Sequence, residues 1–293
     1  MHATDTFVTM PDGVRLFTRT VEPSAASPDP PTLLIPNGIV YLDDFAPVLP
    51  THRLIAYDLR NRGASDPAPA ARGVPDDVAD LEHLRGALGL SRCATLGHSY
   101  VGLVVVLHAM RHAAAIERVV LIGAPPPDAA ATYPPELAYR DEVLPAAFAE
   151  LGRLQQRRAS SEPAAFFRAA WDALRPIYVA DPADAAKIRW DRSELANERE
   201  FVAYWTATVQ PSIQALRISP ADLAALTAPV LVVHGRKDRS APFGAALDWV
   251  ARLPAARLLE VPDAAHAPWL EDPSVLPAIV AFLGERRAAA PPA

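Results

Sequence analysis

Serine, aspartate and histidine occur at points of this sequence where they could form a nucleophilic catalytic site. Ser99 lies in the run LGHSYVG, residues 96–102, between a predicted strand and a predicted helix. A tight strand-to-helix turn holds such a hydroxyl out over a sheet, near helix N–H groups that favour negative charge. Val101 stands where this turn usually has a glycine, and Gly102 follows it. The pattern makes Ser99 a candidate nucleophile, although a plain helix N-cap is the alternative.

A serine hydroxyl becomes a good nucleophile when a base takes its proton and an acid orients that base. Asp238 directly follows a β-branched predicted strand at 230–233, and His266 follows the last predicted strand at 257–261. Serine, then aspartate, then histidine, each beyond a different strand, is the chain order of one known catalytic triad. We therefore predict Ser99 as nucleophile, His266 as base and Asp238 as the orienting acid.

Two other aspartates could orient the histidine, and each predicted partner has a structural alternative. Asp128 follows a predicted strand at 118–122, and Asp263 shares the loop of His266, which makes it a poor orienter. Asp238 could instead be a surface acid paired with its basic neighbours, and His266 could simply pack near Trp269.

Acyl transfer also needs N–H donors aimed at the oxyanion of the tetrahedral intermediate. Tyr100, the residue after the nucleophile, is the predicted first donor. The loop after the predicted strand at 32–35 contains Asn37, Gly38 and Ile39, and we predict the Ile39 N–H as the second donor. Asn37 and Gly38 are also predicted to border the substrate pocket.

Short apolar strands alternate with amphipathic helices along most of the chain. This alternation predicts an α/β fold with a mostly parallel sheet and helices on both faces. A hairpin around the turn Pro11-Asp12-Gly13 adds an antiparallel edge. The strands are predicted at 7–10, 14–21, 32–35, 53–57, 93–96, 118–122, 230–233 and 257–261, and the helices at 74–88, 100–112, 243–252 and 275–286.

The interval from 125 to 228 breaks this alternation, because it is far longer than the dozen or so residues that a crossover needs. We predict an α/β core at 1–124 and 229–293, interrupted by a helical cap at 125–228. Helices are predicted in the cap at about 136–144, 145–158, 163–174, 183–190, 194–209 and 221–226. Trp171, Tyr204 and Trp205 of the cap, with Trp269, are predicted to line the substrate pocket, although such rings could also only pack the cap against the sheet.

Composition excludes several classes of protein. The 293 residues are 51% hydrophobic and 21% charged, as in a globular protein, and the net charge of −6 leaves no basic surplus for nucleic acid. Cys93 is the single cysteine, so neither an internal disulfide nor a cysteine zinc site can form. No signal peptide is visible, and the apolar run at 101–110 is too short to span a bilayer. We expect a cytoplasmic enzyme with a small-molecule substrate, no cofactor, no metal and no membrane or nucleic acid partner; the oligomeric state stays open.

The set of motifs resembles the α/β-hydrolase superfamily, and within it the branch of prolyl aminopeptidases and related serine esterases. The motifs are Asn37-Gly38, DLRNRGAS at 58–65, Gly97-His98-Ser99-Tyr100, HGRKD at 234–238 and His266. The resemblance implies an α/β-hydrolase core with a helical cap over the active site. The oxyanion loop lacks the His-Gly-Gly-Pro-Gly stretch of prolyl aminopeptidases, which argues against a strict peptidase. A serine nucleophile argues against haloalkane dehalogenases and epoxide hydrolases, which use aspartate there.

The favoured prediction is a serine hydrolase that cleaves a small, partly apolar carboxylic ester, thioester or lactone through an acyl-enzyme on Ser99. One alternative is a prolyl aminopeptidase-like amide hydrolase, in which a cap acid such as Glu198 binds the substrate amine. Another is a lyase, a cyclase or a ligand-binding protein that reuses the hydrolase pocket.

Overall fold

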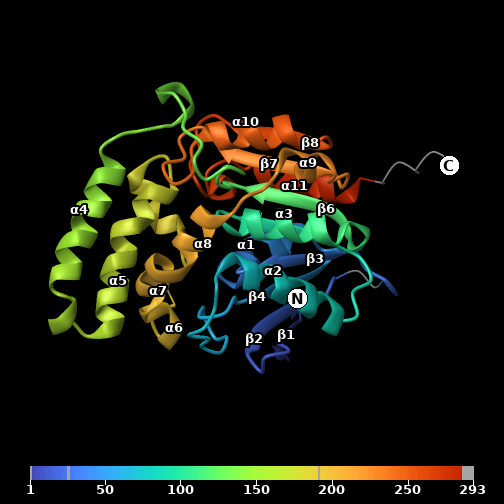
Figure 1. The fold of residues 1–293 in the computed structure, drawn as a ribbon, viewed down its shortest axis with the longest axis horizontal. Coiled ribbons are helices and arrows are strands. Elements are labelled where there is room, and N and C mark those ends of the chain that lie inside the picture. Colours follow the sequence, from blue (N-terminus) through green and yellow to red (C-terminus); the bar gives the residue numbers. More distant parts are fainter. Residues whose placement is uncertain (1, 25–26, 191, 286–293) are drawn as a thin grey trace.

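Eight strands form one mixed sheet in the computed structural model, which describes residues 2–24, 27–190 and 192–285 (Figure 1). The sheet order is β1-β2-β4-β3-β5-β6-β7-β8. β1 pairs with β2 and β2 with β4 in antiparallel fashion, and all later neighbours are parallel, which confirms the predicted fold class. The strands are β1 (Ala3–Thr9), β2 (Arg15–Val21), β3 (Thr32–Pro36), β4 (Arg53–Tyr57), β5 (Cys93–His98), β6 (Ile116–Ile122), β7 (Val230–Gly235) and β8 (Ala256–Val261).

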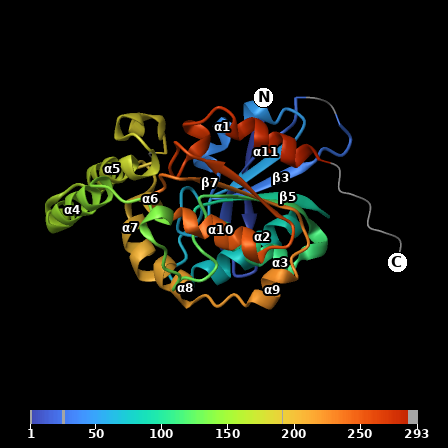
Figure 2. The ribbon, with the colours of Figure 1, turned by 90° about the horizontal axis from the view of Figure 1, so that it is seen from above.

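Apolar side chains on successive strand positions enter two cores, one on each face of the sheet. In β7, Val230 and Val232 join one core, whereas Leu231 and Val233 join the other. Helices cover both faces, so the central strands are buried throughout. Figure 2 shows α1 (Leu42–Phe45) and α11 (Val275–Gly284) on one side of the sheet, and α2 (Val74–Ala87), α3 (Val101–Arg111) and α10 (Phe243–Arg252) on the other. Position 286 of the helix predicted at 275–286 lies outside the described residues.

Between β6 and β7 the chain forms a series of helices, here called the cap segment (residues 125–190 and 192–228). Its two longest helices, α4 and α5, lie at one end of the molecule, outside the layered core, in both views (Figures 1 and 2). The helices are α4 (Val143–Gln156), α5 (Pro163–Leu174), α6 (Ala196–Arg199), α7 (Phe201–Tyr204), α8 (Gln210–Ala215) and α9 (Pro220–Ala224). That the cap segment forms a separate domain stays a prediction.

Three predicted cap helices are wrong in detail. In place of the helix predicted at 183–190 the structure has a 3₁₀ helix at Pro182–Lys187. Over 136–144 the structure has only a turn at Pro135–Leu137, and α4 begins at Val143, because the Asp141 carboxylate accepts the Val143 N–H and also binds Arg239. The single helix predicted at 194–209 is divided into α6, α7 and a π-helical turn at Trp205–Val209. No helix among the described residues is both long and apolar enough to cross a membrane.

The first turn of α3 packs tightly against the chain that leaves β6. A Cβ atom at Gly102 would lie 2.6 Å from the Cβ of Ala124, whereas a Cβ atom at Gly152, inside α4, would meet no atom within 4 Å. Gly102 therefore allows α3 to approach the sheet closely. It lies one position after Val101, where this turn usually has its glycine.

We expect Gly102→Ala to lower the free energy of unfolding by about 1–3 kcal/mol, because the added methyl group overpacks a buried contact. Gly152→Ala should raise it by up to about 1 kcal/mol, because alanine is the better residue inside a helix. Urea denaturation of both variants measures the two effects. A Gly102→Ala variant as stable as the wild type would contradict this packing.

Candidate active site

Ser99 occupies the turn between β5 and α3 in a strained conformation. Its φ is +58°, a left-handed value that few residues other than glycine adopt. The Ser99 N–H donates to the backbone oxygen of Ile122 on the neighbouring strand β6 over 2.8 Å, which helps to hold the turn. Such strain is typical of functional turns, and the residue borders a cavity described below.

Asp238 and His266 meet at the carboxyl end of β7, where both side chains are fully buried. His266 Nδ1 lies 2.7 Å from Asp238 Oδ2, and the other carboxylate oxygen accepts the N–H groups of Ser240 at 2.7 Å and Ala241 at 2.8 Å. The buried His266 Nε2 has no hydrogen-bond partner among the described residues. A carboxylate at Nδ1 places the ring proton there and leaves Nε2 as a free acceptor, the form that a general base needs.

The charge of Asp238 depends on these contacts. Burial alone would raise the pKa of Asp238, but the His266 ring and its hydrogen bond outweigh burial and hold this pKa below its ordinary value. His234, which donates to the Ala241 backbone oxygen over 3.0 Å, adds a smaller effect in the same direction. Asp238 is therefore a carboxylate at neutral pH.

The alternative acids lie elsewhere. Asp263 pairs with Lys237 over 2.9 Å and its side chain is 91% exposed, and Asp128 accepts the N–H of Ala130. The basic neighbours of Asp238 have partners of their own, since Arg236 binds Glu260 and Arg239 binds Asp141. Asp238 is thus a buried partner of His266 and not a surface ion-pair residue.

His98 supports the histidine loop, a role that the sequence pattern did not reveal. Its Nε2 donates to the backbone oxygen of His266 over 2.9 Å, and the two ring centroids are 4.6 Å apart. Burial, with the nearby His266 ring, lowers the pKa of His98 to about 3, so the ring is neutral. The Tyr178 ring of the cap segment packs against His266 from another direction, at 5.1 Å between centroids.

The predicted oxyanion donors lie on two turns at the carboxyl edge of the sheet. Asn37, directly after β3, has a φ of +54°, and the Gly38 N–H donates to the Ile35 oxygen over 3.1 Å. The amides of Tyr100 and Ile39 take part in none of the backbone hydrogen bonds that the described residues form outside their helices and strands. Their role as oxyanion donors stays a prediction.

A cavity of about 440 Å³ lies between the core and the cap segment, beside Ser99. Among the predicted pocket residues, Asn37, Trp171 and Trp205 line it. Its wall is mostly aromatic and aliphatic, with a few polar groups. Other lining residues include Tyr41, Tyr100, Val101, Phe148, Phe167, Tyr178, Trp190, Phe201, Arg62, Glu198 and Gln210.

Three other predicted pocket residues do not line this cavity. Trp269 is buried behind it, where its indole N–H donates to Asp44 over 3.0 Å and its ring stacks on Trp190. Tyr204 is half-buried and packs against the core on the α2 and α3 side, and Gly38 forms the turn after β3. The sequence placed these residues near the site but could not show which way the Trp269 and Tyr204 side chains point.

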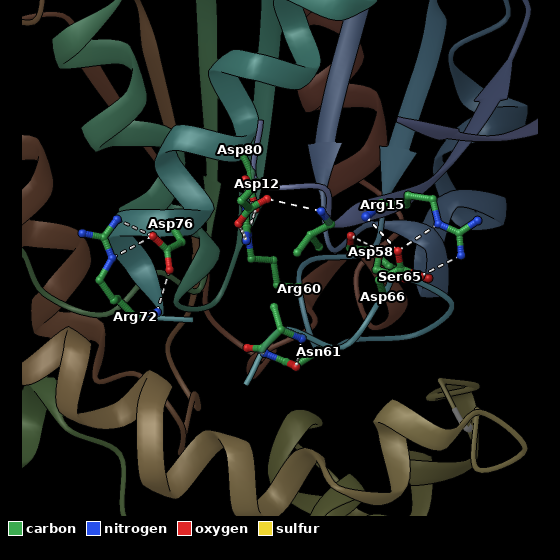
Figure 3. Close-up of polar contacts among 12 residues, drawn as sticks. Asp12, Arg15, Asp58, Arg60, Asn61, Ser65, Asp66, Arg72, Asp76 and Asp80 are labelled. Atoms are coloured by element: carbon green, nitrogen blue, oxygen red, sulfur yellow. Dashed lines mark hydrogen bonds and ion pairs between the residues drawn. The ribbon is translucent and has the colours of Figure 1, made fainter. Parts of the chain in front are cut away.

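Residues 58–66, here called the arginine loop, follow β4 and contain the DLRNRGAS motif. Figure 3 shows the end of the Arg60 side chain beside Asp12 and Asp80. Arg60 binds both carboxylates, and its Nε lies 2.5 Å from Asp80. In the same view Ser65 donates to the Asp58 backbone oxygen over 2.7 Å, and Arg15 binds Asp66. The core side of this loop is therefore fixed by polar contacts, of which those of Arg60 with Asp80 and of Ser65 with the Asp58 backbone oxygen are buried.

The cap segment binds the other side of the arginine loop. Arg192 lies 2.6 Å from Asp58, and Glu198 accepts both the Arg62 side chain at 3.1 Å and the Gly63 N–H at 2.7 Å. Asn197 donates to the backbone oxygen of Ser65 over 2.5 Å, among other backbone contacts. The arginine loop and the cap segment are thus joined by two buried ion pairs, and Arg62 belongs to both this junction and the cavity wall.

Comparison with known proteins adds relatives of this chain. The chain is 29% identical over 222 residues to a protein named carbamate hydrolase RutD from Variovorax paradoxus. This alignment covers 74% of this chain and 75% of that protein. The chain superposes on a serine hydrolase from Cycloclasticus zankles with a TM-score of 0.72 and 19% identity, over 96% of this chain and 98% of the other. It also superposes on an esterase from Exiguobacterium antarcticum with a TM-score of 0.69 and 17% identity. This superposition covers 96% of this chain and 100% of the esterase. None of these three is a prolyl aminopeptidase, so they support the superfamily prediction and not that branch of it.

The family model described as the alpha/beta hydrolase fold matches residues 34–273, most of the chain. This range contains the strained serine turn and the buried Asp238–His266 pair. The chain therefore belongs to the alpha/beta hydrolase fold family.

Proposed function

We propose that the protein cleaves a small, partly apolar carboxylic ester, thioester or lactone through an acyl-enzyme on Ser99. The observation that carries this proposal is the 2.7 Å contact between His266 Nδ1 and Asp238, with a buried Nε2 on the other side of the ring that has no hydrogen-bond partner in the described part of the chain. A histidine oriented in this way has an Nε2 that can accept a proton, and two residues that pack against its ring, His98 and Tyr178, line the same cavity as Ser99.

In this mechanism Ser99 Oγ attacks the substrate carbonyl carbon while His266 Nε2 takes the hydroxyl proton. The oxyanion of the tetrahedral intermediate accepts the N–H groups of Tyr100 and Ile39, which stabilise the charge as it develops. The intermediate collapses as His266 returns the proton to the leaving oxygen or sulfur. A water molecule then attacks the acyl-enzyme with His266 again as base, and Asp238 stays a carboxylate that stabilises the imidazolium.

The cavity supports a substrate that is small and partly apolar. Its volume of about 440 Å³ and its aromatic lining suit a short acyl or aryl group. Phe148, which also lines it, is 58% exposed, so an apolar surface continues from the cavity to the outside.

A carbamate is a second candidate substrate, supported by the relative named as a carbamate hydrolase. Its carbonyl carbon admits the same attack by Ser99, and loss of the alcohol or phenol leaving group then gives a carbamoyl-enzyme instead of an acyl-enzyme. The aminopeptidase alternative has weaker support, because Glu198 already binds Arg62 and the Gly63 N–H instead of standing free for an amine.

The nucleophile is tested by a fluorophosphonate probe, which forms a covalent bond with an activated serine. We expect the wild type to be labelled and Ser99→Ala to lose both labelling and ester turnover, the latter by about 10⁴-fold or more. Intact-protein mass spectrometry and p-nitrophenyl ester hydrolysis measure the two effects. A wild type that neither reacts with the probe nor cleaves activated esters would favour the lyase, cyclase or binding-protein alternatives.

The orienting acid is tested by Asp238→Asn, with Asp263→Asn as the matched control. We expect the first substitution to lower kcat by about 10⁴-fold, because an amide can hold His266 in the wrong tautomer. The second should leave kcat almost unchanged, because Asp263 is exposed and pairs with Lys237. Equal losses in the two variants, measured by steady-state kinetics, would exclude Asp238 as the orienting acid.

The substrate class is tested by a panel of p-nitrophenyl esters of increasing acyl length, a p-nitrophenyl carbamate and proline p-nitroanilide. We expect the highest kcat/KM for short or medium acyl esters, because the cavity is apolar but small. A higher value for the carbamate would select the second candidate. A higher value for proline p-nitroanilide would contradict the ester proposal.

A further inference from the structure

An ion pair forms part of the wall of the otherwise mostly apolar cavity. Arg62 comes from the arginine loop and Glu198 from α6, and their side chains are only 13% and 7% exposed. Both residues line the cavity, as do Ser99 and Tyr100. The ion pair therefore lies where a substrate held by Ser99 would be bound.

The Arg62 guanidinium is fixed on two sides and free on a third. Its Nε and Nη2 donate to the two carboxylate oxygens of Glu198 over 3.1 and 3.3 Å, and its central carbon lies 3.8 Å from the centre of the Phe201 ring. Among the described residues Nη1 has no hydrogen-bond partner, and it is not one of the fully buried atoms that lack one, so it stays accessible. A half-buried donor in this position gains free energy from an acceptor that a ligand supplies.

The charges around this donor are already balanced. Burial alone would lower the pKa of Arg62 and raise that of Glu198, but each partner's charge outweighs burial, so the pKa of Arg62 lies above and that of Glu198 below its ordinary value. Both groups are charged, and the neighbouring pair of Asp58 and Arg192 adds no net charge. A ligand carboxylate would bring an uncompensated negative charge close to Glu198, whereas a neutral carbonyl would not.

We propose that Arg62 Nη1 donates a hydrogen bond to a second, neutral carbonyl oxygen of the substrate, remote from the carbonyl that Ser99 attacks. The substrate class is then an oxo-substituted ester or thioester rather than a plain alkyl ester. This inference rests on the proposed hydrolase function. It makes Arg62 a specificity-determining residue, and the Glu198 carboxylate the group that selects against acidic substrates.

The test compares p-nitrophenyl 4-oxopentanoate with p-nitrophenyl pentanoate, which differ by one carbonyl at similar length. We expect the wild type to show a kcat/KM for the oxo ester at least about tenfold higher, as for one hydrogen bond to a charged group. The double variant Arg62→Met/Glu198→Gln removes the pair without leaving a lone buried charge, and it should lose this preference.

A matched double variant separates two effects: loss of the Arg62 hydrogen bond to the substrate, and weaker attachment of the cap segment to the core. Asp58→Asn/Arg192→Met removes the second ion pair between the arginine loop and the cap segment, and neither residue lines the cavity. It should change kcat/KM for both esters by the same factor and keep the oxo preference. Loss of the preference in this control as well would overturn the assignment to Arg62.

An anionic ester tests the role of the charge balance. The wild type should cleave the p-nitrophenyl monoester of succinate poorly, and Glu198→Gln should raise its kcat/KM relative to the pentanoate ester, because the cavity then carries an unbalanced positive charge. The inference is overturned if the wild type has no higher kcat/KM for the 4-oxopentanoate ester than for the pentanoate ester. It is also overturned if Arg62→Met/Glu198→Gln keeps that difference, or if the wild type has a higher kcat/KM for the succinate ester than for the pentanoate ester. If no ester is cleaved and Ser99 is not labelled, the proposed hydrolase function itself has failed.

Discussion

The hydrogen bond between Asp238 and His266 is the interaction on which the rest of the site depends. Two backbone N–H groups hold one oxygen of Asp238, and the other oxygen contacts His266 Nδ1. The ring is therefore fixed with an Nε2 that has no partner among residues 2–24, 27–190 and 192–285. The chain that leaves β6 packs tightly against this ring, since a Cβ atom at Gly123 would lie 2.8 Å from His266 Nδ1. The ends of β6, β7 and β8 must therefore meet closely before the histidine can act as a base.

The sheet positions the candidate catalytic residues, and the cap segment forms much of the cavity wall. Parallel strands bring Ser99, Asp238 and His266 to one edge, because the carboxyl ends of such strands lie together. The cap segment closes the cavity with aromatic rings and is held to the arginine loop by two buried ion pairs. Such pairs add orientation more than stability, because burial of the charges offsets much of their attraction.

The sequence revealed the parts of this molecule that follow from local patterns. The sheet and its covering helices follow from apolar periodicity, and Ser99, Asp238 and His266 stand at the ends of predicted strands. The cap segment was less predictable, because its short helices depend on contacts with the core. Arg62 and Glu198 are 136 residues apart, and no local pattern pairs them. The direction of the Trp269 side chain likewise depends on packing that a single sequence does not encode.

The central claim is that an acyl group is carried by Ser99 during turnover. Rapid acid quenching of the enzyme during hydrolysis of a p-nitrophenyl ester, followed by proteolysis and tandem mass spectrometry, tests it directly. The account predicts a peptide that carries the acyl mass on Ser99, absent from Ser99→Ala. Acylation at another residue, or turnover that proceeds unchanged in Ser99→Ala, would contradict it.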